Sequence, residues 1–217
     1  HAGDMWNLDH GPFDDWEFLK QHVLPSVNVI ISGGAGKPPH FEESKRAGLR
    51  WISDANNQAH YAREDHLREW KRLGRHWLTI TVNPFRRRDN VTANEAYNVW
   101  SQGVGLNEPL MDGIIVDEFG GGDQPKYGGF RKAIERIYAN PKFKGKTYSP
   151  YSYGSGILSN DLSRDFARAC AKGGGYVCIE RYLVEQPTRR AAEKHIHEQL
   201  HSGWNMPRYE KDFSGVV

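Results

Sequence analysis

Apolar and polar residues follow one another along this chain in blocks. Short runs rich in β-branched and aromatic residues recur about every 30 residues and predict strands. They span 27–31, 49–53, 77–82, 114–116, 146–149 and 176–179, with a stub at 214–217. The segments between them predict helices, from their apolar spacing and from capping residues at their ends. These helices span 41–47, 64–73, 92–100, 127–138, 161–172 and 189–201.

Strand and helix alternate, which is typical of βα units around a parallel sheet. We therefore expect an α/β fold of the (β/α)8 TIM type, with consecutive strands as neighbours and 1–217 as a single barrel domain. A complete barrel usually needs about 250 residues, and this chain has 217. We therefore expect the barrel to be incomplete or truncated after about seven strands, without its C-terminal units. Either the barrel is incomplete, or the chain is a fragment, or a partner chain or missing segment closes it. A doubly wound open sheet is the alternative, but 33–36 does not complete a dinucleotide-binding glycine motif.

Charge and hydropathy exclude several functions. The chain has 29 Lys and Arg against 27 Asp and Glu, so it carries no general nucleic-acid footprint. The basic cluster 86–88 is interpreted as a solvated loop, with a phosphate or sulfate site as the alternative. No apolar run approaches the roughly 20 residues that span a membrane. We expect a secreted or periplasmic protein whose signal peptide has been removed.

The strongest chemical signal is the end of the fourth predicted strand. The buried run 114–116 leads directly into Asp117 and Glu118, and glycines follow at 120–122. Two carboxylates at such a strand end are costly unless they have a task or a partner, and barrel active sites are built at this end of the strands. Glycoside hydrolysis needs two carboxyl groups, one of them acting as an acid. Side chains alternate along a strand, so we expect one of the pair to face the substrate, and Glu118 is the predicted general acid.

The second carboxylate must come from another strand end. Glu180 follows the sixth predicted strand and is the first choice, although an ion pair with Arg181 would also explain it. Asp54 follows the second strand and is the alternative. Other polar residues at predicted strand ends could bind sugar hydroxyls. The predicted substrate-binding residues are Asp54, Asn56, Asn57, Asn83, Tyr151 and Tyr153.

The stretch 111–119 resembles the fourth strand of the (β/α)8 glycoside hydrolases whose acid/base Glu ends that strand. The resemblance implies the acid/base role for Glu118, with Asp117 where the family usually has Asn. The stretch is also similar to the D-G-x-D-x-D-x-E strand of chitinase-like barrels, through Asp112, Gly113 and Asp117. Phe119 stands at the position of the catalytic Glu in that pattern, so chitinase activity is not implied.

Two further features suggest other chemistry. His197 and His201 fit H-E-x-x-H, a spacing that binds zinc on a metalloprotease helix. No well-placed third ligand is evident, so we expect no metal and no cofactor. The two cysteines, Cys170 and Cys178, are interpreted as core residues, and a disulfide between them stays open.

These observations predict a glycoside hydrolase-like enzyme that cleaves a polysaccharide or glycan by carboxylate acid/base catalysis. Its only expected partners are the carbohydrate substrate and whatever closes the barrel, with no nucleic acid and no membrane. Aromatic residues make up 12% of the chain and would also suit sugar binding. A non-catalytic carbohydrate-binding barrel is therefore the second hypothesis, and a zinc metalloprotease is the third.

Overall fold

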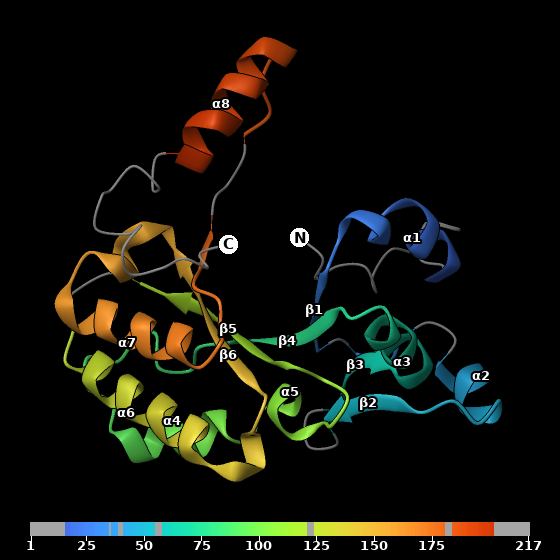
Figure 1. The fold of residues 1–217 in the computed structure, drawn as a ribbon, viewed down its shortest axis with the longest axis horizontal. Helices are drawn as coiled ribbons and strands as arrows, with labels where there is room; N and C mark the ends of the chain where they lie inside the picture. Colours follow the sequence, from blue (N-terminus) through green and yellow to red (C-terminus); the bar gives the residue numbers. More distant parts are fainter. Residues whose placement is uncertain are drawn as a thin grey trace. The chain divides into compact units, whose positions relative to one another are not determined.

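The predicted strands form a mixed α/β fold in a computed structural model of the chain (Figure 1). The structure describes residues 16–34, 36–38, 41–54, 58–120, 124–180 and 184–201. The described residues form a five-stranded parallel sheet, in the order β1-β4-β5-β6-β7, and a two-stranded sheet made of β2 and β3. The strands are β1 (Val29–Gly33), β2 (Trp51–Asp54), β3 (Ala59–Arg63), β4 (His76–Val82), β5 (Gly113–Phe119), β6 (Thr147–Tyr153) and β7 (Cys178–Glu180).

The helices are close to those that the sequence predicts. They are α1 (Trp16–His22), α2 (Phe41–Arg46), α3 (Glu64–Arg72), α4 (Ala93–Trp100), α5 (Val104–Asn107), α6 (Lys126–Ala139), α7 (Asp161–Lys172) and α8 (Arg189–His201). Three short 3-10 helices cover Leu24–Ser26, Pro141–Phe143 and Gly154–Leu158. Among the described helices, none is long and apolar enough to cross a membrane.

The prediction that 49–53 forms the second strand of the main sheet is wrong. This segment becomes β2, which pairs antiparallel with β3 in a hairpin of its own. The physical reason is local: only four residues separate β2 from β3, and a connection this short joins antiparallel strands, whereas a parallel pair needs a long crossover. Strand β1 therefore pairs directly and in parallel with β4, from Val29 opposite His76 to Gly33 opposite Ile80. The predicted stub at 214–217 lies outside the described residues.

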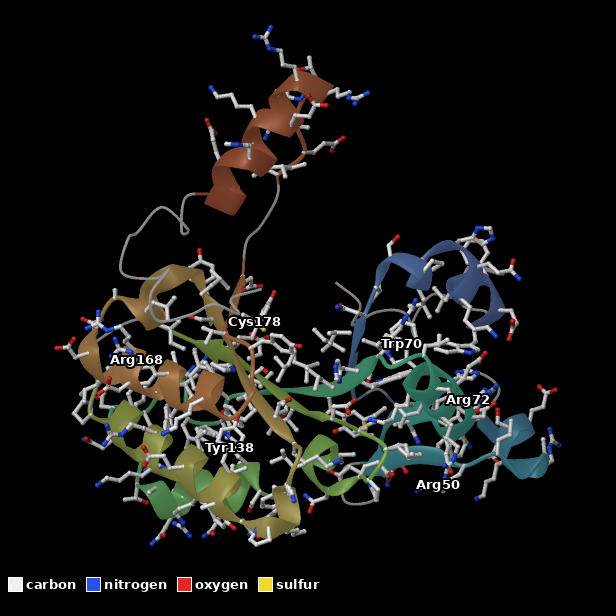
Figure 2. All side chains as sticks on the ribbon, viewed as in Figure 1. Arg50, Trp70, Arg72, Tyr138, Arg168 and Cys178 are labelled. Atoms are coloured by element: carbon white, nitrogen blue, oxygen red, sulfur yellow. The ribbon has the colours of Figure 1, made fainter. Side chains whose placement is uncertain are left out.

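The described residues divide into two compact units, and each is described by itself. The first runs up to Thr81 and adds Trp100–Ile115 and Lys142–Lys146. Its core gathers large side chains around Trp70, which is 1% exposed and is labelled in Figure 2. Two indole groups fix this core by hydrogen bonds: Trp70 Nε1 donates to the His76 carbonyl at 2.8 Å, and Trp77 Nε1 donates to Ser32 Oγ at 2.9 Å.

The second unit comprises Val82–Val99, Val116–Pro141 and the residues from Thr147 on. Helices α6 and α7 pack against each other (Figure 1). Their buried rings join that of Phe119, which contacts Phe130 of α6 and Phe166 of α7 at centroid distances of 5.8 and 5.1 Å. Tyr138 lies at the same layer, and its hydroxyl is 3.1 Å from the Cys170 carbonyl (Figure 2). Many of the described aromatic residues of this unit are therefore core: Phe85, Phe119, Tyr127, Phe130, Tyr148 and Phe166.

The two cysteines are both free, so the disulfide left open by the sequence is absent from this structure. Cys170 is fully buried on α7, and Cys178 is half-buried on β7. Burial raises the pKa of the Cys178 thiol to about 11, so it is a poor nucleophile at neutral pH. Cysteine chemistry is thus not a candidate function of this pair.

Candidate active site

The candidate site is built on the end of β5, where the strand leaves the core. Ile114, Ile115 and Val116 are each at most 1% exposed. The next residue, Asp117, is half-buried, and Glu118 is exposed. The backbone turns sharply here, because Glu118 has φ +66°, in the left-handed region that L residues rarely adopt. Such a conformation costs about 1–2 kcal/mol and is found mainly at functional sites.

A hydrogen bond within the pair stabilises this turn. The backbone N–H of Glu118 donates to Oδ1 of Asp117 at 2.6 Å. The turn carries the two neighbouring carboxyl groups into different surroundings. Asp117 is the more buried member of the pair, and which of the two faces a substrate stays a prediction.

Glu118 forms an ion pair with Arg86, which lies in the loop after β4. Both side chains are accessible to solvent, at 45% and 39% relative exposure. The guanidinium of Arg86 donates a hydrogen bond to Oε2 of Glu118, so the Glu118 carboxylate is the acceptor of this pair. The interpretation of 86–88 as a solvated loop is thus incomplete, since Arg86 belongs to the strand-end cluster.

The surroundings of Asp117 favour its protonated form. Its pKa is raised, first by burial and then by the negative charges of Glu180 and Glu118. The hydrogen bond from the Glu118 backbone and the charge of Arg86 act in the opposite direction. A carboxyl group with a raised pKa can hold a proton nearer to neutral pH and deliver it to a leaving group.

Glu180 and Tyr151 complete the cluster from β7 and β6. These strands pair in parallel, with Tyr151 opposite Cys178 and Tyr153 opposite Glu180. Burial raises the pKa of the Tyr151 phenol, and the charges of Glu180 and Asp117 raise it further. The charge of Glu180 thus acts on both Asp117 and Tyr151, and three residues that the sequence singled out separately lie within electrostatic reach of one another.

Asn83, a predicted sugar-binding residue, has a structural role at the end of β4. Its side chain is 1% exposed. Its Oδ1 accepts the backbone N–H of Phe85 at 3.0 Å, and its own backbone N–H donates to the Asp117 carbonyl at 2.9 Å. Asn83 thus shapes the start of the Arg86 loop and fastens it to β5.

The remaining predicted residues fall into three groups. Tyr153 follows the cluster on β6 with an exposed ring, at 71% relative exposure. Asp54 ends β2 in the first unit, where burial, and then the charge of Asp54, raise the pKa of Tyr61. Asn56 and Asn57 lie outside the described residues, as does Arg181.

The H-E-x-x-H motif lies at the end of α8, where His197 is exposed. The side chain of His201 lies outside the description. Within the described part of the chain, no group of three or more His, Cys, Asp or Glu side chains could hold a metal ion.

Two basic residues near the carboxylates escaped sequence reasoning. Arg86 is one, and the available signal was its place just after a strand end. Lys126 is the other: it begins α6 and is only 5% exposed. The residues at 124–128 do not indicate that Lys126 is buried, because its hydrogen-bond partners, the carbonyls of Arg86 and Asp89, are distant in sequence.

Comparison with protein-family models, with curated proteins and with solved structures found no match to this chain.

Proposed function

We propose that this chain is a glycoside hydrolase-like enzyme that cleaves a polysaccharide or glycan with Asp117 and Glu180. The single observation that carries the proposal is the position of Asp117 on β5, Tyr151 on β6 and Glu180 on β7, at the carboxyl ends of three consecutive strands of one parallel sheet. Asp117 replaces Glu118 as our general acid, because Asp117 is more buried and has a raised pKa while Glu118 is paired with Arg86. Glu118 is instead assigned to anchoring the Arg86 loop.

In this mechanism Asp117 donates its proton to the glycosidic oxygen as the bond from that oxygen to the anomeric carbon breaks. Glu180 then has one of two roles. With the two carboxyl groups about 5–5.5 Å apart it attacks the anomeric carbon itself, and with about 6.5–9.5 Å between them it deprotonates the attacking water. Asp117 afterwards recovers its proton, either from the water that hydrolyses the glycosyl-enzyme or from solvent. Tyr151 and the exposed ring of Tyr153 would contact the sugar.

The proposal includes the finer architecture expected from the sequence, an incomplete (β/α)8 barrel. It is supported by the run β4-β5-β6-β7 of consecutive neighbours and by the helices α6 and α7 that follow β5 and β6. The candidate residues also lie at the carboxyl ends of these strands, where barrel enzymes carry their sites. A polysaccharide substrate would suit a secreted or periplasmic protein.

Release of reducing ends from a panel of polysaccharides and oligosaccharides tests the proposal. The double variant Asp117→Asn/Glu180→Gln should lose all release that the unchanged chain shows, while binding of the same glycan persists. Glu135→Gln removes an exposed carboxylate from α6 and serves as the matched control. Turnover that survives in the double variant would reject the assignment.

A non-catalytic carbohydrate-binding protein is the second candidate. It is favoured by the exposed ring of Tyr153 and by the pairing of the acid Glu118 with Arg86. The same panel separates the two: glycan binding by the unchanged chain, without any release of reducing ends, would identify the binding protein.

A further inference from the structure

The first two residues of α6, Lys126 and Tyr127, hydrogen-bond to backbone carbonyls near both members of the Arg86–Glu118 ion pair. Lys126 Nζ donates to the carbonyl of Arg86 at 3.1 Å, and the Lys126 backbone N–H donates to the carbonyl of Asp89, also at 3.1 Å. The neighbouring Tyr127 hydroxyl donates to the carbonyl of Gly120, directly after β5. The start of α6 is therefore connected to the β4 loop and to the β5 loop.

Lys126 occupies an unfavourable place for a lysine. Its side chain is 5% exposed, and burial lowers the pKa of its ammonium group, partly offset by the charge of Asp89. It also lies at a helix N-terminus, where the helix dipole disfavours a positive charge. The Arg86 carbonyl is the acceptor of its ammonium within the described residues. The cost of burying this cation is offset by the Arg86 carbonyl and by the charge of Asp89, so the ammonium group is held against the Arg86 backbone.

We propose that Lys126 is a positioning residue of the candidate site, which holds the backbone of Arg86 so that its guanidinium stays against Glu118. This inference rests on the proposed function, because it assigns Lys126 to the same carboxylate cluster. Lys126 acts through Arg86 and does not contact the reacting groups. The hydrogen bond from the Tyr127 hydroxyl to the Gly120 carbonyl holds the Glu118 side of the ion pair, because Gly120 lies two residues after Glu118.

The consequence can be measured on Asp117. The charged side chains that act on it are Glu180, Glu118 and Arg86, and Asp117 in turn raises the pKa of Tyr151. Arg86 is the cation among them, and its charge lowers the Asp117 pKa. If Lys126 no longer fixes the Arg86 backbone, the guanidinium moves away and the Asp117 pKa should rise.

The test is a carboxyl NMR titration of chain labelled with 13C-aspartate, in which Asp117→Asn identifies the Asp117 signal. Lys126→Met should raise the Asp117 pKa by nearly as much as Arg86→Met does. The double variant should show no further rise, because both changes remove the same effect. Lys126→Arg keeps a donor and should restore part of the shift. Lys132→Met removes an exposed lysine from the same helix and should leave the Asp117 pKa unchanged.

Two results would overturn the inference. One is an Asp117 pKa that stays at its original value in Lys126→Met but rises in Arg86→Met. The other is a rise from Lys126→Met that persists in full in the Arg86→Met background, which would mean that Lys126 acts directly. Thermal unfolding of each variant checks that it is folded, and Lys126→Gln replaces Lys126→Met if that variant is not. None of these pKa measurements depends on turnover. A chain that hydrolyses no glycan would therefore contradict the proposed function, while the pKa values would still test the role of Lys126.

Discussion

Asp117 accepts a 2.6 Å hydrogen bond from the backbone N–H of Glu118, and this contact accompanies a left-handed backbone at Glu118, with φ +66°. The relationship separates two adjacent carboxyl groups. Asp117 stays half-buried, where the charge of Glu180 acts on it, while Glu118 is exposed and pairs with Arg86. Two residues of the same chemical type thereby come to lie in different surroundings.

This backbone strain predicts an unusual order of stability. Glu118→Gly and Glu118→Ala both remove the ion pair, but only glycine adopts positive φ without steric cost. We expect Glu118→Gly to be more stable than Glu118→Ala by about 1 kcal/mol in urea unfolding. Thr81 supplies the control, because it is an exposed β4 residue outside the positive-φ set. At Thr81 the alanine variant should be more stable than the glycine variant. If alanine were also the more stable variant at position 118, the proposed backbone strain at Glu118 would be contradicted.

Local patterns were sufficient to predict much of this fold. The residues of α7 were predicted with the bounds observed, because apolar residues recur at helical spacing and glycines follow at 173–175. The helix predicted from Thr92 begins with a capping box: Thr92 Oγ1 accepts the Glu95 backbone N–H at 3.2 Å, and Glu95 Oε2 accepts the Thr92 backbone N–H at 2.8 Å. Such signals lie within a few residues of the structure they specify.

The failures involve contacts between distant residues or competing local pairings. Strand β3 was missed because its run at 59–63 includes histidine and arginine among small residues, and β2 was placed in the main sheet for lack of its partner. Pairing of Arg86 with Glu118 spans 32 positions, and that of Lys126 with Arg86 spans 40. The sequence indicates where the carboxylates lie along the chain, but it does not indicate which of them forms an ion pair with Arg86.

His66 predicts a pH dependence of stability in the first unit. Its side chain is 8% exposed, it stacks on Trp16 at a centroid distance of 4.5 Å, and neither ring nitrogen has a hydrogen-bond partner in the described residues. Burial lowers its pKa from 6.5 to about 4. Between pH 6.5 and about pH 4, His66 is therefore protonated in the unfolded chain and neutral in the folded chain. The free energy of unfolding falls as the pH drops from 6.5 to about 4. The full loss is roughly 3 kcal/mol.

His66→Phe keeps an aromatic ring against Trp16 and removes this titration. Urea unfolding at several values between pH 7 and pH 4 should show a shallower decline for His66→Phe than for the unchanged chain. His22→Gln removes an exposed histidine of α1 and should leave the decline unaltered. Parallel curves for His66→Phe and the unchanged chain would refute this account of His66.

The exposed ring of Tyr153 predicts a contribution to glycan binding. Tyr153→Ala should weaken binding by a factor of about ten, since aromatic contacts contribute on the order of 1 kcal/mol, and Tyr153→Phe should retain most of it. Calorimetry with a glycan that the Asp117→Asn/Glu180→Gln variant binds would measure both. Leu73→Ala removes an exposed apolar side chain of the first unit as the control. Equal affinity of Tyr153→Ala and the unchanged chain would remove Tyr153 from the site.

The most direct measurement compares Asp117→Asn and Glu118→Gln on one hydrolysed glycan. As the general acid, Asp117 should account for about 10²- to 10⁴-fold in kcat, and its loss should matter less for a substrate whose leaving group needs no protonation. Glu118→Gln should keep activity within about a factor of ten, because it loses an ion pair and not the proton donor. The opposite outcome, an inactive Glu118→Gln beside an active Asp117→Asn, would contradict the assignment of Asp117 as the acid.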